Sequence, residues 1–86
     1  MTEKDLRRLE KGQKIMDTID SIKETVAKTR IAIREKDSIG RCELYIRGKT
    51  SFKIYLTPEI AVSVLNTIGT KSEEEIKRLQ KEFDEL

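Results

Sequence analysis

Two short runs of alternating apolar residues constrain the fold of this 86-residue chain more than any other feature. They span residues 42–46 and 52–56, and in each run every second residue is apolar. Such alternation is typical of strands with one face toward a core. For the two apolar sets to share a face, Ile46 must lie opposite Phe52. The pattern therefore predicts an antiparallel hairpin with an odd-length loop around Lys49.

The loop between the two runs contains Gly48-Lys49-Thr50, which looks like the end of a phosphate-binding loop. A phosphate-binding loop needs a second glycine five positions before Gly48, where this chain has Glu43. It also needs a helix to follow, whereas the next residues alternate like a strand. We therefore interpret the tripeptide as a turn.

Residues 2–27 predict a long amphipathic helix. Thr2 can cap its first turn, where Glu3 and Asp5 favour the positive end of the helix dipole. Apolar residues then recur with a period near 3.5, as in a short coiled-coil seam. Gly12 falls on this seam and allows another backbone to approach closely. The apolar residues of the seam are Leu9, Ile15, Met16, Ile19, Ile22 and Val26.

Residues 29–36 fit two structures. As a helix, this segment lets Ile33 continue the seam but places Ile31 nearly opposite it. As a strand, it places Ile31 and Ile33 on one face. We favour the strand, which extends the hairpin to a three-stranded meander. The alternative is a first helix of about 35 residues, roughly 50 Å long.

The last third of the chain carries two helix-start signals. Thr57-Pro58 provides an N-cap and a proline in the first turn, and Gly69 is suited to end that helix. Ser72 and Glu75 have the spacing of a capping box. Residues 58–86 are thus predicted to form two helices.

Together these patterns predict an α+β fold. It has a long N-terminal helix, an antiparallel β-hairpin or three-stranded meander, and two C-terminal helices. We expect one small domain over residues 1–86, with the helix at 2–27, the strands at 29–57 and the two helices at 58–86.

Composition argues against an enzyme. Histidine is absent, and no stretch places a nucleophile beside a base or pairs carboxylates in an apolar setting. We therefore expect no catalytic residues, no metal and no cofactor. The single cysteine, Cys42, and the lack of a long apolar run predict a cytoplasmic protein without a membrane segment.

Charge is distributed unevenly along the chain. Residues 28–53 hold eight basic and three acidic residues, whereas residues 54–86 hold four basic and seven acidic ones. If the apolar alternation faces the core, the opposite sheet face is basic and aromatic. It could bind nucleic acid or a phosphorylated ligand such as a nucleotide, or it could be an ordinary solvated face. The candidate anion-binding residues are Arg30, Arg34, Tyr45, Arg47, Lys49, Lys53 and Tyr55.

The run FKIYLTPEIAVSVLNTIGTKSEEEIKRL resembles the ribbon-helix-helix DNA-binding proteins in its order of elements. An alternating strand is followed by a Thr-Pro-Glu helix start, a glycine and a serine-capped second helix. The resemblance covers about the last 35 residues. It implies that the outward strand residues Lys53, Tyr55 and Ser51 would enter the major groove of DNA.

Two amphipathic seams on a thin core favour self-association. We therefore expect a small non-enzymatic protein-interaction module that forms a homo-oligomer and binds another protein. Phage or mobile-element accessory and inhibitor proteins have comparable composition. The alternative is binding of nucleic acid or a phosphorylated ligand through the basic face. The candidate self-association residues are Met16, Ile19, Ile22, Val26, Ile76, Leu79 and Phe83.

Overall fold

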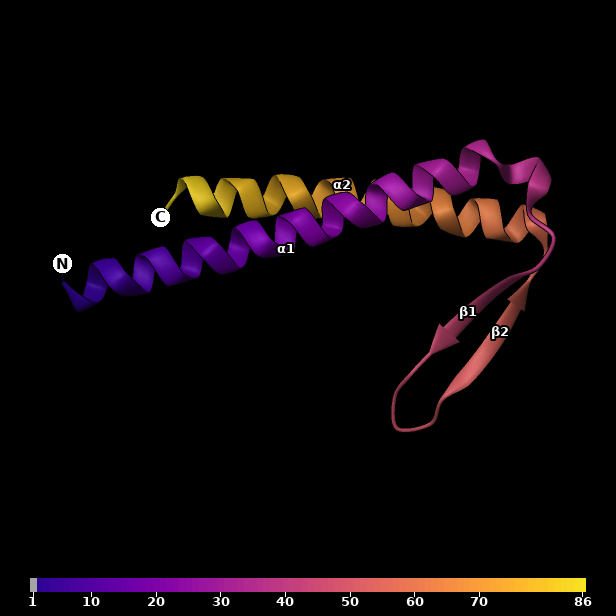
Figure 1. Cartoon of the computed structure of the whole chain (residues 1–86), viewed down its shortest axis with the longest axis horizontal. Coiled ribbons are helices and arrows are strands. Elements are labelled where there is room, and N and C mark those ends of the chain that lie inside the picture. Colours follow the sequence, from indigo (N-terminus) through magenta and orange to yellow (C-terminus); the bar gives the residue numbers. More distant parts are fainter. Residues whose placement is uncertain (1) are drawn as a thin grey trace.

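The computed structural model describes residues 2–86 as two long antiparallel helices joined through a β-hairpin (Figure 1). The hairpin leaves the joined end of the helix pair and projects away from it. The predicted mixture of helix and strand is confirmed, with two helices instead of three and a two-stranded hairpin instead of a meander. The elements in order are α1 (Glu3–Arg34), a 3-10 turn η1 (Lys36–Ser38), β1 (Cys42–Ile46), β2 (Phe52–Leu56) and α2 (Pro58–Asp84).

Helix α1 begins with a capping box. The backbone N–H of Asp5 donates to Thr2 Oγ1 at 3.1 Å, and the backbone N–H of Thr2 donates to Asp5 Oδ2 at 3.4 Å. These bonds satisfy two of the donors that a helix start leaves without a backbone partner. The predicted start of the helix is therefore confirmed.

The predicted strand at residues 29–36 is wrong, because α1 continues to Arg34. Thr29 is buried and Ile33 is half-buried, so the helical form carries the seam two further turns along the molecule. A helix satisfies its backbone hydrogen bonds within itself, whereas a third strand would need a neighbour in the sheet. The helical alternative for this segment is the one the chain adopts.

The hairpin has the predicted register. Strands β1 and β2 are antiparallel, with Ile46 paired with Phe52 and Cys42 with Leu56. Residues 47–51 form the odd-length loop, with Lys49 at its centre. The alternation of side chains therefore determined the strand pairing correctly.

Helix α2 starts as predicted, because Thr57 Oγ1 accepts a hydrogen bond from the backbone N–H of Ile60 at 3.3 Å. The predicted break at Gly69 and the second start at Ser72 are wrong, since the helix runs unbroken to Asp84. A Cβ added to Gly69 would lie 3.6 Å from Thr29 Cγ2 of α1. Gly69 therefore allows close helix packing, which offsets its cost of about 1 kcal/mol within a helix.

A single helix after β2 also removes the basis of the ribbon-helix-helix resemblance. That resemblance implies two helices following the strand, and α2 replaces both of them. In addition, β2 pairs with β1 of its own chain.

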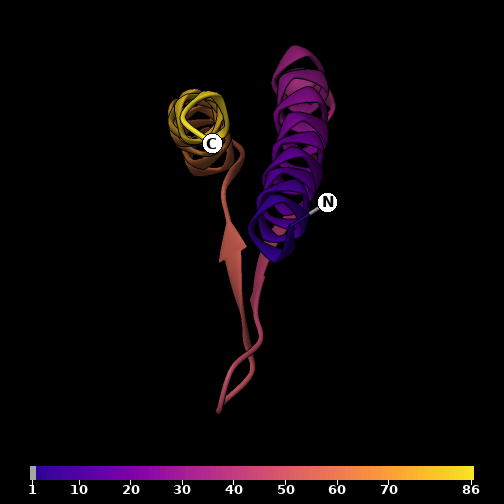
Figure 2. The ribbon, with the colours of Figure 1, turned by 90° about the vertical axis from the view of Figure 1, so that its left-hand side faces the viewer.

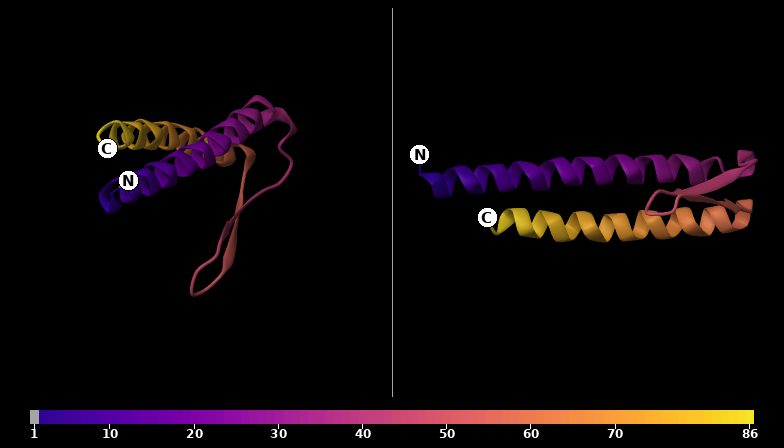
Figure 3. Two further views of the ribbon diagram at one scale, coloured as in Figure 1. Left: turned by 60° about the vertical axis from the view of Figure 1, so that its left-hand side comes forward. Right: turned by 90° about the horizontal axis from the view of Figure 1, so that it is seen from below.

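The core lies between the helices, which run side by side along most of their length (Figure 3). Its centre is formed by Ile15 and Ile19 of α1 and Leu79 of α2, with Ile22 and Ile76 packed at its edge. Ile19 is the most enclosed large side chain, at 1% exposure. The hairpin adds nothing to this cluster.

The molecule is elongated and has one layer of helices (Figure 2). Its extents are 55 × 32 × 15 Å. Its radius of gyration is 17.3 Å, whereas a compact domain of this length has about 12 Å. The accessible surface is 7075 Å², against roughly 5,200 Å² for a compact monomer of 10.0 kDa. The chain thus exposes roughly 1,800 Å² more than a compact monomer would.

Candidate interaction surface

The apolar face of the hairpin is uncovered. Sequence reasoning placed this face toward a core, but no helix of the chain lies over it. The four side chains in its middle and loop-end pairs are 39–49% exposed, and only the two at the base are half-buried. A two-stranded hairpin is marginally stable in water without such cover. The residues of this apolar face are Cys42, Leu44, Ile46, Phe52, Ile54 and Leu56.

The opposite face of the hairpin is polar and is organised around Glu43. Its carboxylate lies 3.2 Å from Arg41 Nε and 4.0 Å from Lys53 Nζ. Arg41 directly precedes β1 and Lys53 lies in β2, so this acid lies between cations from the two sides of the hairpin. All three side chains are on the solvent side and contribute little stability.

Two arginines stack on the two tyrosines of this polar face. Arg41 Cζ lies 4.8 Å from the ring centre of Tyr55, and Arg47 Cζ lies 5.8 Å from that of Tyr45. Cation–π contacts of this kind position a guanidinium group over the ring without using its N–H donors. Sequence reasoning missed Arg41, although its alternation with Glu43 was a usable signal.

The predicted anion-binding residues separate into two groups. Tyr45, Lys53 and Tyr55 lie on the hairpin, with Arg47 and Lys49 in its loop. The other two lie on α1 and not on a strand, because residues 29–34 are helical. Of these, Arg30 pairs with Glu73 of α2 and Arg34 is in the last helical turn.

The predicted self-association residues lie mainly between the chain's own helices. Ile19, Val26 and Leu79 are buried there, and Ile22 and Ile76 are half-buried. Self-association through these five would therefore require the helix pair to open.

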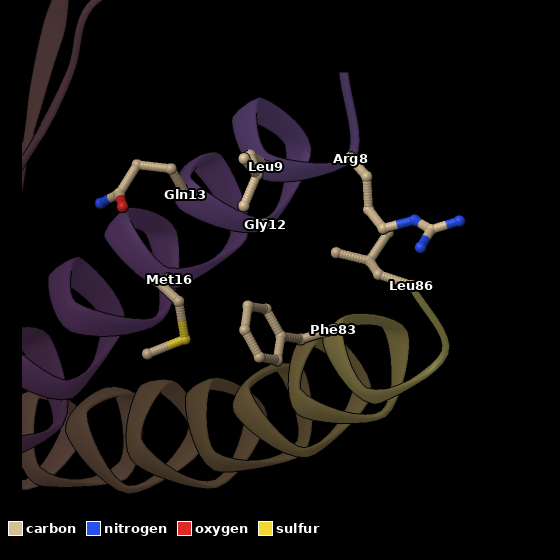
Figure 4. Close-up of a pocket in the computed structure, with 7 residues that line it drawn as sticks. All are labelled: Arg8, Leu9, Gly12, Gln13, Met16, Phe83 and Leu86. Carbon is tan, nitrogen blue, oxygen red and sulfur yellow. The ribbon is translucent and has the colours of Figure 1, made fainter. Parts of the chain in front are cut away.

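The other two candidates remain accessible at the open end of the helix pair. Met16 is 37% exposed and Phe83 is 39% exposed. They line a groove of about 370 Å³ between α1 and α2 (Figure 4). Gly12 lies in this groove, and its missing side chain leaves room for the Phe83 ring. The full lining is Arg8, Leu9, Gly12, Gln13, Met16, Phe83 and Leu86.

One carboxylate has a pKa shifted by its surroundings. Arg78 Nε donates to Glu75 Oε2 at 3.0 Å, and this hydrogen bond lowers the pKa of the Glu75 carboxyl below its usual range. Both side chains are exposed on α2, far from the hairpin in sequence. This pair is a surface contact of the helix.

Two kinds of feature are absent from residues 2–86. No helix there has both the length and the apolar character needed to span a membrane. In the same residues, no three histidine, cysteine or carboxylate side chains lie close enough together to hold a metal ion.

Neither a known protein family, nor a curated protein, nor a solved structure matches the chain.

Proposed function

We propose that the chain is a small non-enzymatic protein-interaction module that self-associates and acts by binding another macromolecule. The observation that carries this proposal is the excess of accessible surface over a compact monomer, roughly 1,800 Å². A standard protein–protein interface removes about 800 Å² from each partner. The excess surface is large enough for one interface with a second copy of the chain and for another with a different partner.

The distribution of apolar side chains supports the same proposal. Domains ordinarily bury their apolar faces between two packed layers, whereas this chain has one layer of helices and an uncovered hairpin. Large apolar side chains are exposed both on the hairpin and at the open end of the helix pair. Contiguous exposed apolar residues mark interaction sites in soluble proteins.

Sedimentation equilibrium over a range of protein concentrations tests self-association. We expect a mass that is a whole multiple of 10.0 kDa and that falls toward one chain on dilution. Pull-downs with the assembled protein would then identify the second partner. A single-chain mass at about 100 µM would contradict the proposal, because a functional self-association should have a dissociation constant well below that concentration.

A second candidate function is binding of a polyanion, such as single-stranded nucleic acid, by the polar hairpin face. The two Arg–Tyr stacks favour it, because fixed guanidinium groups bind phosphates and exposed aromatic rings stack on bases. Arg41, Arg47, Lys49 and Lys53 supply four positive charges to the hairpin against one negative charge from Glu43.

Salt dependence of oligonucleotide binding tests this second function. Replacing Arg41 and Arg47 by alanine should make the slope of log affinity against log salt shallower by about 1.4, since each phosphate contact on a single strand contributes about 0.7. Replacing Arg7 and Lys28 on α1 removes the same charge elsewhere and serves as the matched control. Equal slopes for both double variants would exclude the hairpin as the binding face.

A further inference from the structure

We infer that the polar hairpin face binds single-stranded nucleic acid through its bases as well as its phosphates, with one base stacked on Tyr45 and another on Tyr55. This inference rests on the second candidate function proposed above, binding of a polyanion by this face. It names the class of polyanion and the two side chains that select it.

Both tyrosines are accessible to a ligand. Tyr45 is 52% exposed and Tyr55 is 61% exposed. The hairpin projects from the joined end of the helix pair (Figure 1), and every strand residue of its polar face is exposed. Every nucleobase has a flat face that can stack on an aromatic ring. The two rings are therefore available as stacking platforms.

The tyrosines lie between two arginines along this face. From the base of the hairpin to its loop, the strand register gives the order Arg41, Tyr55, Tyr45 and Arg47. Each arginine stacks on the nearer ring, at 4.8 Å and 5.8 Å from the two ring centres. An arginine occupies one side of its ring, so a base stacks on the other side. The face thus presents an inner pair of rings between an outer pair of guanidinium groups.

The spacing of the rings favours a single strand over a duplex. Tyr55 and Tyr45 belong to successive cross-strand pairs of the same face, which places them roughly 6.8 Å apart along the hairpin. Neighbouring bases of a duplex are stacked about 3.4 Å apart, half that distance. A duplex therefore cannot place adjacent bases on both rings. A single strand can, because its bases separate and turn outward.

The cations of the face are placed to contact the phosphates that join the stacked bases. Glu43 lies 3.2 Å from Arg41 Nε, which carries one N–H, so the other four N–H donors of Arg41 are not used by this contact. Toward the loop, the positive charge continues through Lys53, Arg47 and Lys49. These cations bind any polyanion. The rings add affinity only for a polyanion that carries accessible bases.

The test compares three DNA probes of about ten residues, a typical length for a single-strand binding site. They are an oligothymidylate, an abasic deoxyribose-phosphate chain of the same charge, and a G·C-rich duplex. Fluorescence anisotropy gives the dissociation constant of each. We expect Tyr45→Leu and Tyr55→Leu each to weaken binding of the oligothymidylate at least about fivefold. Neither change should weaken binding of the abasic chain or the duplex more than about twofold.

Two kinds of control show that the loss comes from the rings. Tyr45→Phe and Tyr55→Phe keep a ring and should bind oligothymidylate within about twofold of the unsubstituted protein. Phe52→Leu removes a ring from the other face of the same hairpin and should change none of the three affinities.

Salt dependence separates stacking from a role of the tyrosines in positioning the arginines. Stacking releases no counterions, so the tyrosine-to-leucine changes should lower the affinity for oligothymidylate by the same factor at every salt concentration. A tyrosine that acted only by holding its arginine would instead make the slope of log affinity against log salt shallower, and would weaken binding of the abasic chain as well.

The outcomes distinguish this inference from the proposed function. A loss confined to oligothymidylate, restored by phenylalanine and constant with salt, supports the inference. Equal losses for the three probes, or no loss with any of them, overturn it while binding of a polyanion stands. If no probe binds at about 50 mM salt with a dissociation constant below about 100 µM, the limit of ordinary non-specific binding, both are overturned.

Discussion

The ring of Phe83 occupies the space that a side chain on Gly12 would need. A Cβ added to Gly12 would lie 3.3 Å from Phe83 Cε2 and 3.4 Å from Leu86 Cδ1. Both neighbours are side-chain atoms at the open end of the helix pair, where Phe83 is 39% exposed. The ring therefore has room to shift.

We predict that Gly12→Ala stabilises the fold by about 0.5 kcal/mol, less than the full gain of about 1 kcal/mol for this change in a helix, because Phe83 must move. Gly69→Ala is the matched control, since its Cβ would make an ordinary 3.6 Å contact with Thr29. It should gain about 1 kcal/mol. Urea unfolding followed by circular dichroism measures both. A loss of stability in Gly12→Ala would show that the Phe83 ring is held rigidly.

The centre of the core should dominate stability. Ile19→Ala is expected to lower the free energy of unfolding by about 2–4 kcal/mol, since it removes an enclosed side chain and leaves a cavity. Met16→Ala, one turn away and 37% exposed, should cost less than about 1 kcal/mol. Equal losses at the two positions, in equilibrium unfolding at one protein concentration, would indicate that Met16 is covered in the assembled protein.

The ion pair between Arg30 of α1 and Glu73 of α2 should contribute little. Both side chains are largely solvent-exposed, and exposed pairs are worth less than about 1 kcal/mol. A double-mutant cycle of Arg30→Ala and Glu73→Ala in unfolding experiments gives the coupling energy directly. That energy should shrink further at high salt. A coupling well above about 1 kcal/mol would contradict an exposed pair.

Arg78 should control the titration of Glu75. The hydrogen bond from Arg78 lowers the pKa of the Glu75 carboxyl from its ordinary value of 4.5. Stability linked to this group is therefore present above pH 4.5 and is lost as pH falls through the lower folded-state pKa. Carboxyl-carbon NMR should show the Glu75 pKa rising toward 4.5 in Arg78→Ala. An unchanged pKa would mean that the pair is not formed in solution.

The hairpin could be predicted from sequence because its signals are local. Alternation assigns each strand side chain to one of the two faces of the hairpin. The register that pairs Ile46 with Phe52 places both apolar sets on the same face. The start of α2 was equally clear, since Thr57 and Pro58 act through the first helical turn. What alternation could not reveal is whether another element covers the apolar face.

The errors arose where packing between helices decides the structure. Ile31 and Ile33 fit a strand, but the neighbouring Thr29 is buried against α2, and its hydroxyl donates to the Thr25 carbonyl at 2.7 Å. Gly69 was misread as a helix end because its function, allowing close packing of the two helices, depends on contact with Thr29, forty residues earlier. The periodicity of apolar residues does not show which distant residue will pack against a given position of a helix.

The predicted anion-binding residues come together only in part. Five of the seven basic and aromatic candidates belong to the hairpin: alternation placed the three on its strands, and the expected loop between the strands placed Arg47 and Lys49. Arg30 and Arg34 were misplaced because the helix boundary was misplaced.

The antiparallel helix pair also has a mechanical consequence. The start of α1 and the end of α2 lie at the same end of the molecule, opposite the hairpin (Figure 1). A force that pulls residues 3 and 84 apart therefore acts on one interhelical contact at a time, as in opening a zipper. The Gly12–Phe83 contact would separate first and the Thr29–Gly69 contact, near the hairpin, last. The resistance to the pulling force therefore comes from one contact after another and not from the whole core at once.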